Sequence, residues 1–515
     1  MKTRRLVLAA LLTATVALPA AAADRNNRHP HRDRFDSWWL THAVTADRIH
    51  DHLRKLQRIA DRNDDNRSLG TSGYGASVRY VADRLKRAHY KVTIQPFTAN
   101  LFDLNGQELE QVSPTPTTYV ADTDFTAMTY SGSSPVGGIT APLVAVDIQI
   151  PPGPTPSSST SGCEAADFVN VAGKIALIQR GTCFFEDKAQ NAAAAGAVGV
   201  IIFNEGQPGR TELLTGTLGN PQPLPVVGAT FALGEELNLA LQGGPVTMRL
   251  EVDQTTTPVP TWNVLGEKKG RVKTQDVVVG AHLDSVPEGP GINDNGSGTA
   301  TLLTIAEQMS RLHIKPRNTV RFAFWGAEEE GLFGSTYYVD NLTQEQFDNI
   351  ALNLNFDMVG SPNFARFVYD GDGTLGGAGP PGSDVIEEVF TDYFDRNRLA
   401  SEPTAFDGRS DYFAFIQSGI PAGGLFSGAE GIKTPAQRAL YGGTAGAAYD
   451  PCYHQACDTI HNLSRRALSQ FGKAAAHAVL HFAMTRENVR PAEAETARAA
   501  AAVSSADYRG PRLVR

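Results

Sequence analysis

The sequence predicts an α/β fold in which helices flank a mostly parallel mixed sheet, with a smaller α/β domain inserted into the main one. Strand-like and helix-like segments alternate over residues 275–361, and this alternation is typical of a parallel sheet covered by helices on both faces. Residues 163–255 contain a second run of short strands and helices. The chain has 515 residues, 41% hydrophobic and 20% charged, a globular composition with room for several domains.

Residues 1–23 have the pattern of a secretory signal peptide. Three basic residues within the first five precede an apolar run over 6–18, and an Ala-rich segment ends at Ala23. We expect cleavage before Asp24. The apolar run is too short for a membrane anchor, and no later stretch has 18 unbroken apolar residues. We therefore expect a secreted, extracellular protein with no membrane partner after cleavage.

The overall charge excludes one large class of partners. Lys and Arg total 46 whereas Asp and Glu total 55, which gives a formal net charge of −9. Nucleic-acid binding favours a basic surface, so we expect no nucleic-acid partner. We further expect the mature chain to be a monomer.

The first part of the main domain is expected at residues 41–130, after a polar leader at 24–40. Apolar residues recur at helical spacing over 45–62 and again over 75–88, which predicts two amphipathic helices. Residues 91–97 then read as a strand.

A Gly-, Pro- and Ser-rich stretch from residue 131 marks the start of an inserted domain at 131–255. Within it we predict a buried strand at 174–178, a helix at 188–197 and a second strand at 198–203. This unit shows no obvious catalytic cluster.

The second part of the main domain, residues 256–488, contains strands that lead into chemically reactive side chains. Each predicted strand is followed by a histidine or a carboxylate: His282 and Asp284 after 276–279, Glu328 and Glu329 after 319–325, and Asp357 after 352–356. Open α/β sheets bind their ligands beyond the carboxyl ends of the strands, so we expect the functional site there. An Ala- and Arg-rich tail at 489–515 is expected to be disordered.

These side chains have the inventory of a dinuclear metal site, which needs a bridging carboxylate, terminal carboxylates and imidazoles. The sequence supplies such a set: His282, Asp294, Glu329, Asp357 and His454. Imidazoles with carboxylates suit zinc, and Mn²⁺ or Co²⁺ are substitutes; calcium binding is left open. Asp284 is placed to orient His282 through the second imidazole N–H. Each residue alone is commonly structural, but their joint placement favours a metal centre.

The four cysteines are expected to form disulfides, because export leads to an oxidising compartment. Four cysteines allow three pairings, and proximity favours Cys452–Cys457, which leaves Cys163–Cys183. Metal ligation by thiolates is the alternative, but the chain has no CxxC pair.

Over residues 40–485 the chain resembles the secreted bacterial zinc aminopeptidases. Their metallopeptidase family also contains glutamate carboxypeptidase-like and transferrin-receptor-like proteins. The matching segments are GAHLDSVP at 280–287, GINDNGSGT at 291–299, FWGAEEEGLFGST at 324–336, NFDMVGSP at 355–362, DGRSDY at 407–412 and DPCYHQACDTI at 450–460. The insertion resembles a protease-associated domain, on residues 170–184 and 195–205. Such domains commonly cover or regulate access to the active site, and a passive role is the alternative.

The resemblance implies a role for each site residue. His282 and Asp357 would hold the first metal, and Glu329 and His454 the second. Asp294 would bridge both ions. Glu328 would be the general base that takes a proton from the metal-bridging water and returns it to the leaving amine. Tyr453 would donate a hydrogen bond to the oxyanion, and Arg409 would lie near the substrate.

We interpret the activity as that of an aminopeptidase with two Zn²⁺ per chain, acting on peptides with a free N-terminus. A free amine favours acidic surroundings, and Arg409 is the only obvious cation near motifs that carry Glu328, Asp357 and Asp411. The resemblance implies a preference for large apolar N-terminal residues such as leucine. The alternatives are a carboxypeptidase of the same family, a non-catalytic receptor-like binding protein, and a single-zinc cyclising acyltransferase of the glutaminyl-cyclase type.

Overall fold

The computed structural model describes residues 36–154, 157–207 and 210–490. The signal peptide, most of the leader and nearly all of the tail lie outside the described residues, so those predictions stay predictions. Helix α1 (Trp38–Ala43) begins inside the range predicted as leader, and Val489, at the predicted start of the tail, is buried. No helix among the described residues is long and apolar enough to cross a membrane.

The central sheet of the main domain is mostly parallel, as predicted. Strand β9 (Val272–His282) lies between β10 (Asn318–Trp325) and β11 (Ile350–Phe356), parallel to both. Strand β14 (Ala422–Phe426) continues the sheet parallel to β11. At one edge, β12 (Phe367–Tyr369) pairs antiparallel with β14 and parallel with β13 (Glu402–Thr404).

Both faces of this sheet are buried, which explains why its central strands are continuous apolar runs rather than alternating ones. Along β9, Val277, Val279 and Ala281 belong to one apolar cluster, whereas Val278 belongs to another. Successive side chains of a strand point to opposite faces, so each cluster covers one face. The first cluster receives helices α2 (Ala46–Ala60), α3 (Ser72–Arg87), α6 (Gly296–Arg311), α9 (Ser383–Arg396) and α12 (Arg465–Met484). The second receives α7 (Phe333–Asp340), α8 (Gln344–Asn349) and α10 (Tyr412–Gln417).

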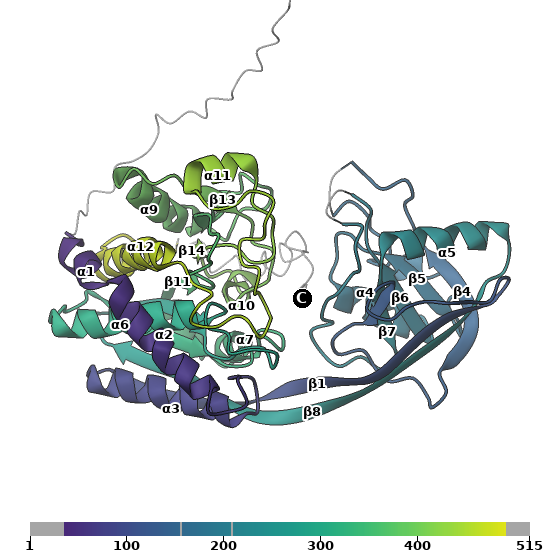
Figure 1. The fold of residues 1–515 in the computed structure, drawn as a ribbon, viewed down its shortest axis with the longest axis horizontal. Helices are drawn as coiled ribbons and strands as arrows, with labels where there is room; N and C mark the ends of the chain where they lie inside the picture. Colours follow the sequence, from purple (N-terminus) through teal and green to yellow (C-terminus); the bar gives the residue numbers. More distant parts are fainter. Residues whose placement is uncertain (1–35, 155–156, 208–209, 491–515) are drawn as a thin grey trace, which may run out of the picture. The chain divides into compact units, whose positions relative to one another are not determined.

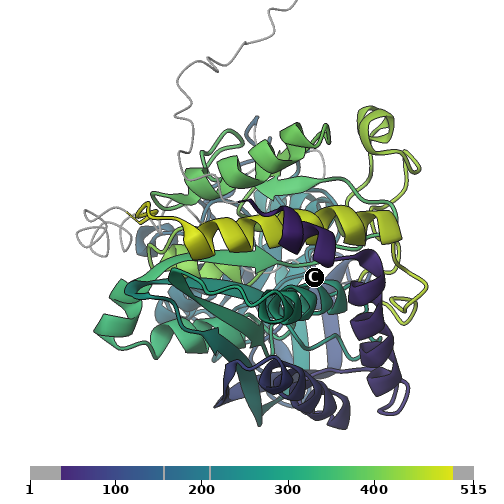
Figure 2. The same ribbon diagram turned by 90° about the vertical axis from the view of Figure 1, so that its left-hand side faces the viewer.

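Helix α2 shows how the local sequence builds these layers. The Thr45 side chain caps its first turn by accepting a hydrogen bond from the backbone N–H of Arg48. Its apolar stripe of Ile49, Leu53 and Leu56 is fully buried. Burying three such side chains contributes roughly 5–9 kcal/mol of hydrophobic stabilisation before conformational entropy is subtracted. Near the other end of the chain, α12 packs against α1 and α2 (Figure 2).

The insertion is a small α/β unit, as predicted (Figure 1). Its parallel strands are β4 (Ile139–Val146), β5 (Ile175–Gln179), β6 (Gly199–Phe203) and β7 (Val226–Ala229), with β3 (Phe125–Ala127) antiparallel at one edge. Helices α4 (Phe185–Ala194) and α5 (Phe231–Gly243) pack on this sheet. The Cys163–Cys183 disulfide lies within the insertion.

Two long strands join the insertion to the main domain, and the sequence did not predict their length. Strand β1 (Lys91–Ser113) pairs antiparallel with β8 (Thr247–Lys268) over nearly their whole length, so β8 runs without interruption through the predicted boundary at 255. Pro258 and Pro260 made this strand difficult to predict from the sequence. They are tolerated because this stretch of β8 pairs only with β1 among the described strands, which leaves one side free of the sheet.

Candidate metal centre and substrate pocket

The predicted ligands converge at the carboxyl edge of the central sheet. His282 is the last residue of β9, Glu329 follows β10, and Asp357 comes directly after β11. Asp294 lies in the loop before α6, and His454 lies in the late loop before α12. Because neighbouring parallel strands end at the same edge, short loops suffice to bring these five residues together.

Asp294 faces both imidazoles through different oxygens. Its Oδ1 lies 3.2 Å from the Nε2 of His282, and its Oδ2 lies 3.2 Å from the Nε2 of His454. The Nε2 of His282 also lies 3.3 Å from the Oδ1 of Asp357, and that of His454 lies 3.1 Å from the Oε2 of Glu329. The geometry therefore divides into two half-sites that share Asp294.

Three residues at this centre adopt the left-handed backbone region. They are Ala327 (φ 54°), Met358 (φ 49°) and His454 (φ 55°). A non-glycine residue in this region costs of order 1–3 kcal/mol and persists only where the surroundings enforce it. Two of them adjoin site residues: Ala327 precedes Glu328, and Met358 follows Asp357.

Burial and charge shift the pKa values of the cluster. Burial alone would raise the pKa of Asp294, but hydrogen bonds from His282 and His454 outweigh it and hold that pKa well below its usual range. Burial lowers the pKa of His454, whereas Glu329 and Asp294 raise it, to about 10. Burial raises the pKa of Glu328 well above its usual value, against the opposing effect of His282. The carboxylates thus stabilise positive charge here.

This donor set fits zinc. Ligand atoms around a tetrahedral zinc ion, with bonds of 2.0–2.2 Å, lie about 3.3 Å apart, and the four nitrogen-to-oxygen distances of the two half-sites are 3.1–3.3 Å. The buried centre also carries four carboxylates against two imidazoles. A buried excess of negative charge requires compensation, and divalent cations supply it.

Asp284 lies near the Nδ1 of His282, where an orienting role was predicted for it. Its Oδ1 is 3.7 Å from the Nδ1 of His282, longer than a hydrogen bond. Its second oxygen, Oδ2, accepts a hydrogen bond of 3.2 Å from the backbone N–H of Glu329. Asp284 therefore links two of the strand ends that carry ligands.

Sequence reasoning missed the groups that hold the Asp294 loop. Asp458 is buried. Its carboxylate accepts hydrogen bonds from the backbone N–H groups of Asn293 and Asp294 at 2.9–3.1 Å. Asp458 belongs to the same loop as His454, so it ties the two loops together. Its only sequence signal was its place in the 450–460 motif.

Arg67 was also missed, although it is fully buried beneath the centre. Its guanidinium donates hydrogen bonds to three backbone carbonyls of one loop: Leu283, Pro290 at 2.9 Å and Gly291 at 2.7 Å. This loop connects His282 to Asp294. Arg67 therefore fixes the path of the chain between two predicted ligands.

Arg67→Met should destabilise the protein by about 3–5 kcal/mol, because it leaves buried carbonyls without donors. It should also weaken zinc binding, since the loop between His282 and Asp294 loses its support. Denaturant unfolding and zinc titration of the refolded variant measure the two effects. Arg67→Lys keeps the charge but not the fork of donors, and should lie between parent and Met variant. Unchanged zinc affinity in a destabilised Met variant would limit Arg67 to general stability.

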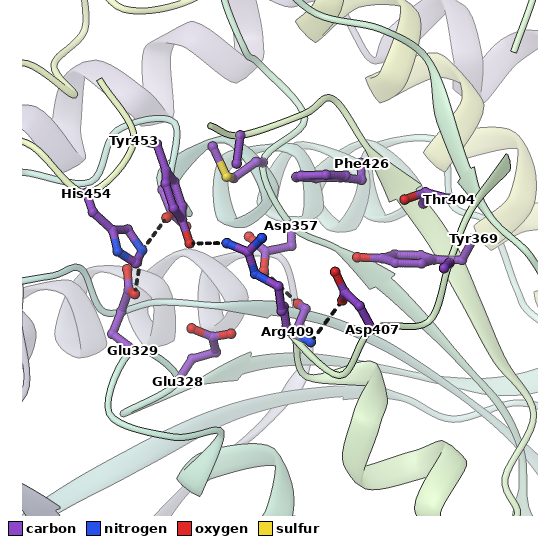
Figure 3. A pocket seen from close by; sticks show the side chains of 15 residues that line it. Glu328, Glu329, Asp357, Tyr369, Thr404, Asp407, Arg409, Phe426, Tyr453 and His454 are labelled. Carbon is purple, nitrogen blue, oxygen red and sulfur yellow. Dashed lines mark hydrogen bonds and ion pairs between the residues drawn. The ribbon is translucent and has the colours of Figure 1, made fainter. Parts of the chain in front are cut away.

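Glu328, Tyr453 and Arg409 lie beside the two half-sites (Figure 3). Glu328 places its Oε2 3.8 Å from the Nε2 of His282. The Tyr453 ring stacks on His454 with centroids 3.8 Å apart, and its hydroxyl accepts a hydrogen bond of 3.2 Å from Arg409. The other arm of Arg409 donates to Glu430 at 2.7 Å. Burial raises the pKa of Tyr453 well above its usual value, so its hydroxyl keeps a proton to donate.

A pocket opens directly from the ligand cluster. One part of its wall is formed by site residues, and the other combines apolar side chains with the polar Thr404 and Asp407 (Figure 3). The apolar side comprises Met358, Tyr369, Ala405, Phe426 and Ala429. Among the described residues that line it, Arg409 and His454 are the only basic ones, and both already face carboxylates.

The Cys452–Cys457 disulfide closes the short loop that carries Tyr453 and His454. Cys452→Ser with Cys457→Ser should lower the free energy of unfolding by about 2 kcal/mol, the loop-entropy value for so short a ring. It should also lower kcat, because both side chains lose their fixed positions. Thermal unfolding and leucine p-nitroanilide kinetics measure these effects, with Cys163→Ser/Cys183→Ser as the control that spares this loop. An unchanged kcat would show that the loop is rigid without the bond.

Comparisons with known proteins show the family of the chain. Residues 263–479 match peptidase family M28, and residues 139–237 match the PA domain. The chain is 49% identical to an aminopeptidase of Pseudomonas aeruginosa, covering 83% of this chain and 79% of that one. It is 40% identical to leucine aminopeptidase 2 of Trichophyton tonsurans, covering 84% and 83%. A zinc aminopeptidase from Bacillus subtilis aligns over 87% of this chain and 97% of its own, with 27% identity and a TM-score of 0.57.

Proposed function

Because this chain belongs to peptidase family M28 and is a zinc-dependent aminopeptidase, we propose that it releases large apolar residues, leucine among them, from the N-termini of peptides. The observation that carries this proposal is the direct junction of a pocket that has an apolar side with the ligand cluster. An apolar side chain in that pocket would place its own amine and peptide bond beside Glu328 and Asp357.

We assign two zinc ions to the two half-sites. His282 and Asp357 would hold one ion, Glu329 and His454 would hold the other, and Asp294 would contribute to both. The opposed oxygens of Asp294 support the bridge. When bound, zinc supplies positive charge that polarises the scissile carbonyl and lowers the pKa of water.

Glu328 acts as the general base and then as the general acid. It takes a proton from the attacking water and transfers it to the nitrogen of the leaving amine. Its place beside the proposed ligands supports this role, and burial raises the pKa of its carboxyl, which favours uptake of the proton from water. Glu329 cannot share the role, since His454 lies against its carboxylate.

Tyr453 donates its hydroxyl proton in a hydrogen bond to the oxyanion that forms on the carbonyl oxygen. Arg409 donates to the same hydroxyl oxygen, so it orients the Tyr453 proton away from itself and towards the pocket. Hydrogen-bond donors fixed in advance are effective at this step because they need no reorganisation.

The electrostatics of the pocket favour an N-terminal amine over a C-terminal carboxylate. The lining carries several carboxylates, Asp407 among them, whereas its one arginine, Arg409, is paired with Glu430. A carboxypeptidase would need a free cation at this place. We further propose that the chain is secreted after removal of residues 1–23 and acts as a monomer; both disulfides are consistent with an oxidising compartment.

Hydrolysis of leucine p-nitroanilide by the purified chain tests the proposal. A chelator should abolish the activity, and stoichiometric zinc should restore it, with full recovery at two ions per chain. Glycine and glutamate p-nitroanilides serve as matched substrates for the side-chain preference. Equal rates on all three would contradict the apolar pocket, and full recovery at one ion per chain would contradict the two-zinc assignment.

A further inference from the structure

A groove between α2 and α3 concentrates positive charge on a chain whose net charge is −9. Its volume is about 480 Å³, and it shares no residue with the substrate pocket. Five cationic side chains line the groove: Lys55, Arg58, Arg62, Arg84 and Arg87. Asp83 is the only carboxylate among the described residues that line it.

Most of this charge is not neutralised from within the chain. Lys55, Arg62 and Arg87 make no ion pair with any residue in the described ranges. Arg58 donates through its Nε to a backbone carbonyl, that of Arg54, at 3.1 Å. The four side chains can therefore turn towards an external anion without breaking an ion pair.

Several arginines outside the groove are neutralised within the chain. Arg249, Arg321 and Arg396 each pair with a carboxylate. In the groove only Arg84 does so, with Glu307. The groove therefore brings together four cations that no described carboxylate neutralises.

The spacing of the cations favours a ligand with repeated negative charges. Lys55, Arg58 and Arg62 lie three and four residues apart on α2, which places them roughly 4.5–6 Å apart along the helix axis. Arg84 and Arg87 face them from α3 with a similar spacing. Guanidinium groups bind oxyanions through paired N–H donors. Arg58 and Arg62 on α2 and Arg87 on α3 can therefore bind successive anions of one chain, whereas Arg84 is held by Glu307.

The net charge of −9 argues against nucleic-acid binding by the surface as a whole, but the groove is locally basic. We propose that this groove binds a phosphodiester chain. Its walls offer many hydrogen-bond donors, and the side-chain acceptors among its described lining are those of Asp83, Asn63 and Tyr80. Each phosphodiester group carries one negative charge and only acceptor oxygens, so it matches such walls. An acidic peptide would also bring one backbone N–H donor per residue, most of them without an acceptor there. A linear chain can lie along a groove between two helices. A flat lipid surface can contact only the outer edges of the groove.

The test is the binding of a fluorescein-labelled abasic deoxyribose phosphodiester oligomer of about ten units to the zinc-loaded protein. An abasic probe removes any contribution of base stacking. Arg58→Gln with Arg87→Gln should weaken binding by about tenfold or more. The control, Arg48→Gln with Arg79→Gln, makes the same charge change on the same two helices outside the groove, and should change binding by less than about twofold. Both variants should hydrolyse leucine p-nitroanilide at the parent rate.

Several results would overturn the proposal. Equal weakening by both variants would mean that only net charge attracts the probe. Equal competition by polyglutamate of the same length would assign the groove to acidic peptides, and binding confined to phosphatidylglycerol vesicles would assign it to a lipid surface. A lower thermal midpoint without any change in probe binding would mean that the cations only stabilise the carboxyl ends of α2 and α3. None of these results bears on the peptidase assignment.

Discussion

Glu328→Gln should lower kcat by about 100- to 10,000-fold and leave the zinc content unchanged, because glutamine cannot take up the proton of the attacking water. The variant keeps the size of the side chain and leaves the proposed ligands untouched. Leucine p-nitroanilide kinetics and metal analysis of the same sample measure both quantities. KM should change little, since the apolar side of the pocket does not include this residue.

The control for this change is Glu288→Gln, which removes an exposed carboxylate from the loop after His282. It should keep the parent kcat. Near-normal turnover of Glu328→Gln would disprove the base assignment. Loss of zinc together with turnover would instead make Glu328 a ligand. Its Oε2 lies 3.8 Å from the Nε2 of His282, farther than the oxygen of Asp357 at 3.3 Å.

Asp294→Asn should weaken the binding of both zinc ions together, by about 100-fold or more. The expected loss exceeds the 10- to 100-fold cost of mutating an outer partner of a ligand. The neutral amide removes the negative charge that faces both imidazoles, and only one of its two polar atoms can bind a metal. Chelator competition followed by metal analysis resolves the two affinities, and activity should fall in parallel.

Asp357→Asn provides the matched comparison. Of the two imidazoles, Asp357 faces only that of His282. This change should weaken one ion and spare the other. Loss of a single ion in Asp294→Asn would contradict the bridge. The unfolding transitions of the metal-free forms show whether either variant fails to fold.

The sequence by itself determined the architecture of the main domain and the position of the site. Central strands such as 276–279 and 352–356 are apolar without alternation because both of their faces are buried, so composition alone revealed them. His282 and Asp357 directly follow such strands, and parallel strands must end at one edge. The insertion was visible for the same reason, in its own apolar strands at 174–178 and 198–203.

The extent of β1 and β8 was decided only by tertiary structure. The middle of β8 is polar and contains Pro258 and Pro260, and nothing local predicts a strand there. Antiparallel pairing with β1 supplies the backbone hydrogen bonds that stabilise it. A strand that is stabilised mainly by pairing with a partner distant in the sequence is difficult to predict from its own composition.

The supports of the metal centre were likewise decided by tertiary contacts. Arg67 lies more than two hundred residues from the loop whose carbonyls it binds, and Asp458 binds backbone N–H groups that lie 164 and 165 residues away. Both residues recognise backbone groups, which every residue type carries. No pattern of side chains could therefore reveal these contacts. The proposed ligands could be predicted because metal binding restricts the type of side chain, whereas the residues that support them depend on where the folded chain places them.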